Sequence, residues 1–315
     1  MKERLYWIDI AKGIAMLLVL LGHIATWQES LPWIDGINFF HVPIWIFLSA
    51  LFITASDTFT SFFVKRASRL LKPYYIYAFI IMLVHIYSTD DYINILLCER
   101  KAGSIWFLPL LFSTLLIAYF IFKLRIIYQI LACTLSLIIS YFLTLYNIIL
   151  PFNIDIALYM LLFVVIANHY RNFILQHHYK FLIAFIALSL LISITAICKI
   201  YPQLMCNFYS SHLGILPITI ILGFAGFYLI FYISQWIEKH SNNYLFHLRQ
   251  FLLFIGRNSM VFIIFHQKLC FNLLPLHKLR FLHPACVDLI AFIFVISFCS
   301  IVTFIVNKYF KFTIS

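Results

Sequence analysis

Charged residues are scarce in this chain of 315 residues, since Asp, Glu, Lys and Arg together make up only 10% of it. A soluble domain of this size carries roughly 25% charged residues. The shortage therefore excludes a sizeable soluble domain. Repeats of 20–50 residues and low-complexity linkers are also lacking, so neither a repeat protein nor a chain of separate modules is indicated.

The sequence also lacks the motifs of common soluble enzymes. It contains no GxGxxG, GxxxxGK[ST], GxSxG or HExxH pattern, which are the signatures of nucleotide binding, esterases and zinc proteases. The seven cysteines form no CxxC pair, and the polar residues do not follow the spacing of a known metal-ligand motif. We therefore predict no metal site and no permanently bound cofactor. No basic run is long enough, or mixed with exposed aromatic residues, to indicate a nucleic-acid site, so no nucleic-acid partner is predicted.

Long apolar runs dominate what is present, because 64% of the residues are hydrophobic and the mean hydropathy is +1.00. A run of about 20 apolar residues is long enough to cross a bilayer once. The sequence predicts an all-α, polytopic membrane bundle that forms one domain over residues 1–315. Its expected spans are 6–26, 37–55, 73–89, 104–122, 126–146, 151–168, 181–201, 213–236, 251–273 and 286–307.

The formal net charge of +11 sits in the connections between these runs. Basic residues mark the cytoplasmic side of a membrane protein. One set of loops and ends is much richer in Lys and Arg than the other, with Lys65, Arg66, Arg69 and Lys72 as its densest group. We therefore expect both termini to be cytoplasmic. The predicted location is the inner membrane of a bacterium, crossed several times.

The first apolar run carries three titratable residues, Asp9, Lys12 and His23. Such groups are costly in hydrocarbon, and they usually face a bundle interior and mark a site. At about 100° per residue, His23 returns to within roughly 40° of Asp9 and 20° of Lys12, so the three share one stripe. His23 lies roughly 21 Å along the axis from Asp9, which excludes a touching pair.

The basic segment KRASRLLKPYY follows the second run, where we expect a cytoplasmic loop. Arg66 and Arg69 are three residues apart and would share a face if the segment were helical. Guanidinium groups bind phosphate with two parallel hydrogen bonds. The segment with Lys65 could thus hold the phosphates of a nucleotide-bearing donor. The simpler alternative is a loop that only sets topology.

Four further residues are candidates, each with a structural alternative. His41 is expected at the depth of His23, and it could equally be a hydrogen-bonded interface residue. Trp106 could be only an interfacial anchor. Asp155 could accept hydrogen bonds from sugar hydroxyls, or could simply favour a helix start. His266 lies deep in its run, where a histidine is a functional candidate by default.

Taken in order, these segments resemble acyltransferase family 3, the integral-membrane O-acyltransferases, and are closest to its fucose 4-O-acetylase-like sugar acetylases. The matching pieces run from residue 4 to about residue 266. They are WIDIAKGIAMLLVLLGH, FFHVPIWIFLSALF, KRASRLLKPYY, SIWFLPLLF, LPFNIDIALYMLLFVVIA and IGRNSMVFIIFH. Two departures affect local geometry: Ser49-Ala50 replaces the usual Ser-Gly pair, and Asn168 replaces a glycine.

The resemblance implies acetyl-CoA as the cytoplasmic donor and a carbohydrate hydroxyl as the acceptor. It implies that His23 is the general base, and that Arg66 and Arg69 form the RxxR element associated with CoA. We expect Asp9, on the same stripe as His23, to be a catalytic residue as well. With it, we expect Lys12, Lys65 and Trp106 on the donor side. We expect His41 and Asp155 to shape the acceptor pocket or orient the base. His266, counted with them as substrate-binding, is expected deeper, where it would line the donor channel or brace the first helix.

The function expected from the sequence is therefore O-acetylation of a cell-surface polysaccharide or its lipid-linked precursor. One alternative is a polytopic exporter or flippase for such glycans. Transporters of that kind often show inverted repeats and interrupted helices, and no repeat is found here. Another alternative, a purely structural membrane protein, leaves the titratable stripe unexplained. The sugar that accepts the acetyl group is not specified by the sequence.

Overall fold

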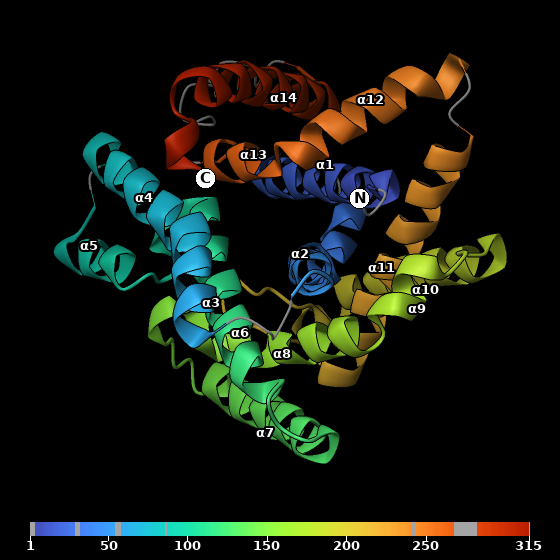
Figure 1. The fold of residues 1–315 in the computed structure, drawn as a ribbon. Coiled ribbons are helices and arrows are strands. Elements are labelled where there is room, and N and C mark those ends of the chain that lie inside the picture. Colours follow the sequence, from blue (N-terminus) through green and yellow to red (C-terminus); the bar gives the residue numbers. More distant parts are fainter. Residues whose placement is uncertain are drawn as a thin grey trace. The chain divides into compact units, whose positions relative to one another are not determined.

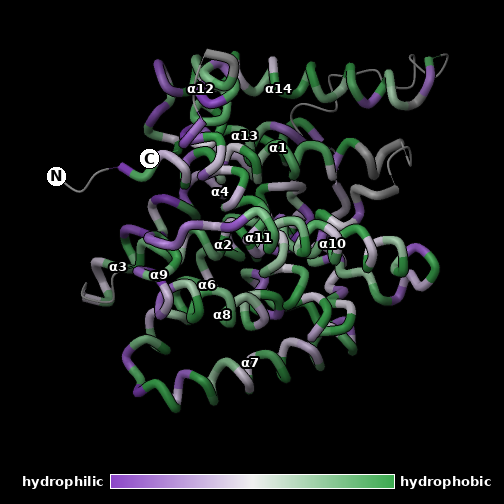
Figure 2. Tube along the Cα trace, turned by 90° about the vertical axis from the view of Figure 1, so that its right-hand side faces the viewer, coloured by the Kyte–Doolittle hydropathy of each residue, from purple (hydrophilic) through white to green (hydrophobic). Residues whose placement is uncertain are grey.

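The computed structural model describes residues 4–28, 32–53, 58–85, 87–240, 243–267 and 282–314. Over these ranges the regular elements are all helical (Figure 1). The all-α prediction is therefore confirmed. Figure 2 shows that hydrophobic residues predominate along the long helices, as a lipid-facing bundle requires.

Eight helical stretches in the described ranges are long and apolar enough to cross a membrane, and a bent pair would make nine. This confirms a multi-pass membrane fold, with fewer clear spans than the ten expected. Five of the eight are built on the single helices α1 Tyr6–Gln28, α7 Ile126–Leu145, α10 Phe181–Ile200, α11 Leu216–Lys239 and α14 Pro284–Tyr309. The orientation of the termini stays a prediction.

The expected span 37–55 is not one helix. The 3-10 helix η1 Pro32–Phe39 precedes the short helix α2 His41–Ala50. Pro43 lies in the first turn of α2, as expected, where its missing N–H costs little. For the same reason a helix continuing from η1 would lose a hydrogen bond at Pro43. Residues 54–55 of this expected span lie outside the described ranges.

The basic segment is helical, which corrects the expected loop. Helix α3 Phe59–Arg66, the π-helical turn η2 Ala67–Leu71 and helix α4 Lys72–Val84 follow one another without a break. The span expected at 73–89 therefore begins at Phe59. Pro73 would clash with the carbonyl four residues earlier in a regular helix. The wider π turn relieves that crowding, and the Lys72 N–H instead bonds to the Ala67 carbonyl.

Two other expected spans also differ in shape. The short helix α5 Thr89–Leu96 and the 3-10 segment η3 Arg100–Trp106 lead into α6 Phe107–Ile121. Helices α12 Asn243–Arg257 and α13 Ser259–Phe265 are bent by 68° at the break between them. Residues 268–273 of the expected span 251–273 lie outside the described ranges.

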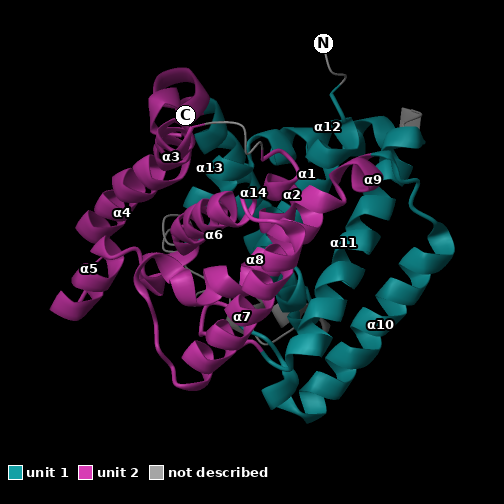
Figure 3. Ribbon diagram, turned by 60° about the horizontal axis from the view of Figure 1, so that its bottom comes forward, with its two compact units in different colours: residues 1–45, 176–207, 214–304 teal, residues 46–175, 208–213, 305–315 magenta. Residues whose placement is uncertain are grey.

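The chain packs as two compact units (Figure 3), each described here by itself. Unit 1 consists of residues 1–45, 176–207 and 214–304. Unit 2 consists of residues 46–175, 208–213 and 305–315. The single domain expected over 1–315 stays a prediction beside this division.

Unit 1 is built around α1, which packs against α11 and α12. Two glycines bring α1 and α12 into backbone contact. A Cβ at Gly13 would meet the Leu252 carbonyl, and one at Gly256 would meet the Asp9 carbonyl. Ile10, Leu252 and Leu253 are buried beside this crossing. Small residues are the usual means of close helix approach in membranes.

Unit 2 is centred on α6, which packs on α8 Ile154–His169 and on the π turn η2. Helix α7 also packs along α8. The 3-10 turn η4 Pro151–Asn153 precedes α8, and the short helix α9 Arg171–Gln176 follows it. The chain ends at η8 Lys311–Thr313, where Thr313 Oγ1 lies 2.9 Å from the hydroxyl of Tyr77 on α4.

Candidate functional site

A cluster of histidines lies inside unit 1. The ring centroids of His23 on α1 and His266 at the end of α13 are 5.1 Å apart, with the rings tilted by 38°. The segments KGIAMLLVLLGH on α1 and NSMVFIIFH on α13 therefore bring two imidazoles together. His41 begins α2 in the same unit.

His41 and His266 are held in a similar way. The Nδ1 atom of His41 lies 2.9 Å from the Ile37 carbonyl oxygen, and that of His266 lies 2.7 Å from the Phe262 carbonyl oxygen. His266 is 1% exposed. Imidazole accepts or donates a proton near neutral pH, which is the property that general acid–base chemistry needs. This cluster is the part of unit 1 best suited to proton transfer.

Asp9 lies at the other end of α1 and has its own partners. Its Oδ2 accepts hydrogen bonds from Arg4, at 2.9 Å from Nε and 2.6 Å from Nη2, and Arg257 Nε lies 3.4 Å away. Lys12 is half-buried one turn further along. Asp9 is therefore engaged in an ion-pair network where α1 meets α12. Its expected catalytic role stays a prediction.

The basic segment of unit 2 presents its cations differently. The guanidinium carbon of Arg66 lies 5.2 Å from the centre of the Phe62 ring, a cation–π contact. Lys65 and Arg69 are exposed. Arg69 lies within the π turn that follows Arg66, and this turn is wider than an α-helical one, so the two do not have the angular relation expected for residues three apart in an α-helix. Their role at the donor phosphates stays a prediction.

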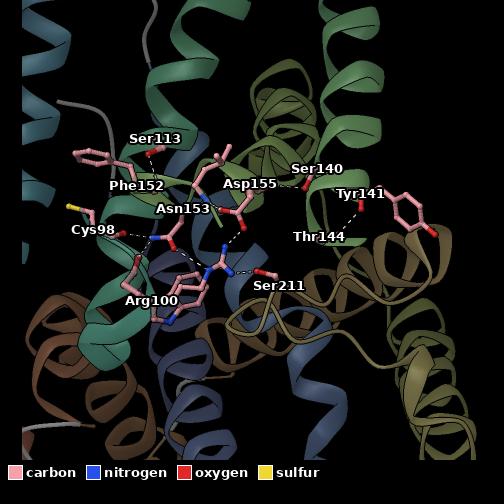
Figure 4. A network of polar contacts seen from close by, with 12 residues as sticks. Cys98, Arg100, Ser113, Ser140, Tyr141, Thr144, Phe152, Asn153, Asp155 and Ser211 are labelled. Carbon is pink, nitrogen blue, oxygen red and sulfur yellow. Dashed lines mark hydrogen bonds and ion pairs between the residues drawn. The ribbon is translucent and has the colours of Figure 1, made fainter. Parts of the chain in front are cut away.

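Figure 4 shows a second buried polar network, entirely within unit 2. Arg100 at the start of η3 forms an ion pair with Asp155 in the first turn of α8 and donates to Ser211 Oγ. Its Nε donates to Asn153 Oδ1 at 3.1 Å. Arg100 is 4% exposed and Asp155 is fully buried. The charges are thus paired and hydrogen-bonded, which is the condition for burying them.

Asn153 closes this network through its backbone conformation as well as its side chain. Phe152 and Asn153 have φ values of 57° and 54°, a left-handed region that Asn tolerates better than most residues. Asn153 Nδ2 donates to the carbonyls of Cys98 and Trp106 at 2.9 and 3.2 Å. The turn before α8 is thereby tied to both ends of the η3 segment.

These contacts favour a structural role for Asp155. Its Oδ1 accepts from the Leu150 N–H at 3.3 Å, and its backbone carbonyl accepts from Ser140 Oγ at 2.5 Å. The expected contact with sugar hydroxyls stays a prediction. The sequence pattern does not single out Arg100, because it lies in an expected loop. A signal existed: Arg100 lies on the side expected to be poor in basic residues, and Asp155 was the lone acid of its run.

Trp106, the expected donor-side aromatic, is buried at the end of η3. Its ring meets that of Tyr209 edge to face, with centroids 5.9 Å apart. Burial raises the pKa of the Tyr209 hydroxyl above its ordinary value, although the charges of Lys101 and Arg100 act in the opposite sense.

No group of three or more His, Cys, Asp or Glu side chains with metal-binding geometry occurs among the described residues. Arg4 and Arg257, the partners of Asp9, were the other functional-site neighbours that the sequence did not single out. Arg257 is 248 residues from Asp9 in the chain. A local sequence pattern cannot relate residues that far apart.

A family model described as an acyltransferase domain, that of acyltransferase family 3, matches residues 5–305. The match covers both units and almost the whole chain. The comparisons with curated proteins and with solved structures gave no match.

Proposed function

The chain belongs to acyltransferase family 3, and we propose that it is an acetyl-CoA-dependent O-acetyltransferase of a bacterial inner membrane. Its acceptor would be a hydroxyl of a cell-surface polysaccharide or of the lipid-linked precursor. Family membership and the eight or nine candidate spans support acyl transfer at a membrane. The pair His23–His266 is the observation that carries the more specific proposal.

The proposed reaction needs a base, because a sugar hydroxyl is a poor nucleophile. His23 takes the hydroxyl proton as the oxygen attacks the carbonyl carbon of acetyl-CoA. An oxygen–carbon bond forms, and the carbon–sulfur bond then breaks. The proton held by His23 passes to the departing sulfur, which leaves as the thiol of CoA. The ester product and free CoA balance the step without an oxidant, a reductant or a metal.

The arginines of unit 2 are assigned to the donor. CoA carries phosphate groups, which guanidinium groups bind with paired, charge-assisted hydrogen bonds. Arg66 and Arg69 lie on the side that the basic residues predict to be cytoplasmic, where acetyl-CoA is found. Arg69 is exposed and Arg66 is half-buried over Phe62. Exposure of this kind leaves the guanidinium of Arg69 accessible to a ligand from water.

The test is CoA release by the purified, detergent-solubilised full chain supplied with acetyl-CoA and a bacterial polysaccharide. Free thiol reports turnover, and mass spectrometry of the glycan reports the gain of an acetyl group. His23→Ala should lower the rate by about 10²–10⁴-fold, the usual contribution of a general base. The exposed His240 provides a matched control, and His240→Ala should leave the rate unchanged.

Two outcomes would contradict the proposal. One is thiol release at the wild-type rate by His23→Ala, which would remove this histidine as the base. The other is the absence of acetylated glycan from wild-type protein across a panel of polysaccharide and lipid-linked acceptors, when acetyl-CoA binding is intact. Transport of an unmodified glycan in vesicles by the same protein would then favour an exporter.

A further inference from the structure

Three histidines in the described ranges each make the same kind of local hydrogen bond. His41, His240 and His266 each place Nδ1 within 2.7–2.9 Å of the backbone carbonyl four residues earlier. A carbonyl oxygen can only accept, so Nδ1 must carry the proton in the neutral ring. In each ring, Nε2 is then a hydrogen-bond acceptor. The backbone thereby fixes the tautomer before any substrate binds.

His266 differs from His240 in its surroundings. His240 is exposed, whereas His266 is 1% exposed. The Nε2 atom of His266 is buried and has no hydrogen-bond partner among the residues that the structure describes. Buried polar atoms of native proteins are nearly always paired, because an unpaired one loses its hydration without compensation. Such an acceptor needs a donor close by.

The ring beside His266 is that of His23, at 5.1 Å between centroids. Helices α1 and α13 pack on each other within unit 1. A catalytic histidine usually has its second ring nitrogen bound by a third group that fixes its orientation. Asp9 cannot fill that place, since it lies roughly 21 Å along α1 and is paired with Arg4 and Arg257.

We propose that His266 is the positioning residue of the acyl transfer, its Nε2 accepting a hydrogen bond from a ring N–H of His23. The other nitrogen of His23 is then the one presented to the acceptor hydroxyl as a base. This inference rests on the proposed function and deepens it. It assigns to a neutral imidazole the orienting task that a carboxylate performs in many hydrolytic enzymes.

The proton balance is simple. When His23 takes the hydroxyl proton it becomes an imidazolium with two N–H groups. One of them donates to His266 Nε2, and the other delivers its proton to the leaving sulfur. His266 keeps its own proton on Nδ1, bonded to the Phe262 carbonyl, throughout the cycle. A hydrogen bond to a charged donor is stronger than one between neutral groups, so His266 helps most when the charge has formed.

The experiment separates the two nitrogens of His266 by substitution. His266→Gln can place an acceptor oxygen near the position of Nε2. His266→Asn keeps a donor near Nδ1 for the Phe262 carbonyl but has no acceptor at Nε2. His266→Phe preserves the ring volume and removes both. The control is His240→Phe, which removes a histidine with the same local hydrogen bond from an exposed position.

The full chain in detergent is assayed for thiol release with acetyl-CoA and polysaccharide. We expect kcat to fall about 10- to 150-fold in His266→Asn and His266→Phe, the range for loss of a hydrogen bond to a charged group. His266→Gln should recover most of that loss. The KM for acetyl-CoA should stay unchanged in all three, and His240→Phe should match wild type. Wild-type kcat in His266→Phe, or a Gln variant as slow as the Asn variant, would overturn the inference.

A second readout does not depend on turnover. Nitrogen-15 spectra of protein labelled at histidine distinguish the two neutral tautomers of each ring. His23 should show one tautomer in wild type and a mixture in His266→Asn, while His41 should not change. An unchanged His23 signal would overturn the inference even if kcat fell. The failure of the proposed function is distinguishable, because wild-type protein would then release no thiol at all.

Discussion

Arg100 and Asp155 form an ion pair in the interior of unit 2, although 55 residues separate them in the chain. The pair joins the η3 segment to the first turn of α8 and is enclosed by Asn153 and Ser211. No other acidic side chain bonds to Arg100 in the described ranges. The network therefore ties together the ends of three segments, and its loss should be seen first in stability.

Removing one charge of this pair should cost more than removing both. Asp155→Leu leaves the Arg100 guanidinium buried without its partner, and we expect a loss of about 3–5 kcal/mol in the free energy of unfolding. The double variant Arg100→Met with Asp155→Leu should be less destabilised than the single one. Thermal unfolding in detergent measures both. Equal midpoints for wild type and Asp155→Leu would show that the pair is unimportant.

The arginines of the basic segment should affect the donor more than the acceptor. We expect Arg66→Ala and Arg69→Ala each to raise the KM for acetyl-CoA about 10- to 150-fold, the range for a charge-assisted hydrogen bond. Arg69→Lys should recover little if the contact is bidentate. The control is Arg125→Ala, another exposed basic residue on the expected cytoplasmic side. A donor KM unchanged in both alanine variants would leave this segment only its topological role.

The close crossing of α1 and α12 should be sensitive to a single methyl group. A Cβ at Gly13 meets backbone atoms of Leu252, which cannot move aside. Overpacking of this kind costs about 1–3 kcal/mol, so Gly13→Ala should lower the unfolding midpoint. Gly22 lies on the same helix, and among the described residues a Cβ there would meet only a side-chain carbon of Ile37, at 4.0 Å. Gly22→Ala should therefore be neutral or stabilising, and equal effects at both glycines would refute the crossing.

The predicted orientation can be tested with reporter fusions at four loops. Fusions after Leu124 and His178 should report the cytoplasm, and fusions after Asn147 and Gln203 should report the outer side. The expectation follows from the distribution of basic residues. A reversed pattern would place Arg66 and Arg69 away from acetyl-CoA. That result would contradict the donor assignment as well as the topology.

The fold class was predictable because bilayer crossing imposes a length and a composition that the sequence displays directly. The breaks within the expected spans were harder to predict from the sequence. The sequence predicts one span over 251–273, yet the helix breaks at Asn258, within the polar stretch Arg257–Ser259. There the Asn258 side chain donates to the Phe254 carbonyl at 2.8 Å. Short polar side chains compete in this way with the regular ladder of hydrogen bonds. Hydropathy alone does not register such competition.

The candidate site was predictable only in part. A titratable residue in an apolar run is a candidate because placing it in hydrocarbon costs free energy. His23, His41 and His266 were identified on this ground. Their mutual distance depends on how helices pack, and a sequence does not state it. Arg100 was overlooked for the opposite reason, because a charge in a loop is ordinary. What made it unusual was its complete enclosure, a property of the folded chain alone.

The π turn at Ala67–Leu71 has a consequence for how this segment tolerates insertions and deletions. The π turn holds one residue more than an α-helical turn. The directions of the side chains on α4 are therefore offset from those that one continuous α-helix from α3 would give. Tyr74 and Tyr77 stay buried on α4 while Arg66 stays over Phe62. Deleting one residue between 67 and 71 would rotate one half against the other by about 100°. The length of the segment, as much as its charge, then determines where the arginine points.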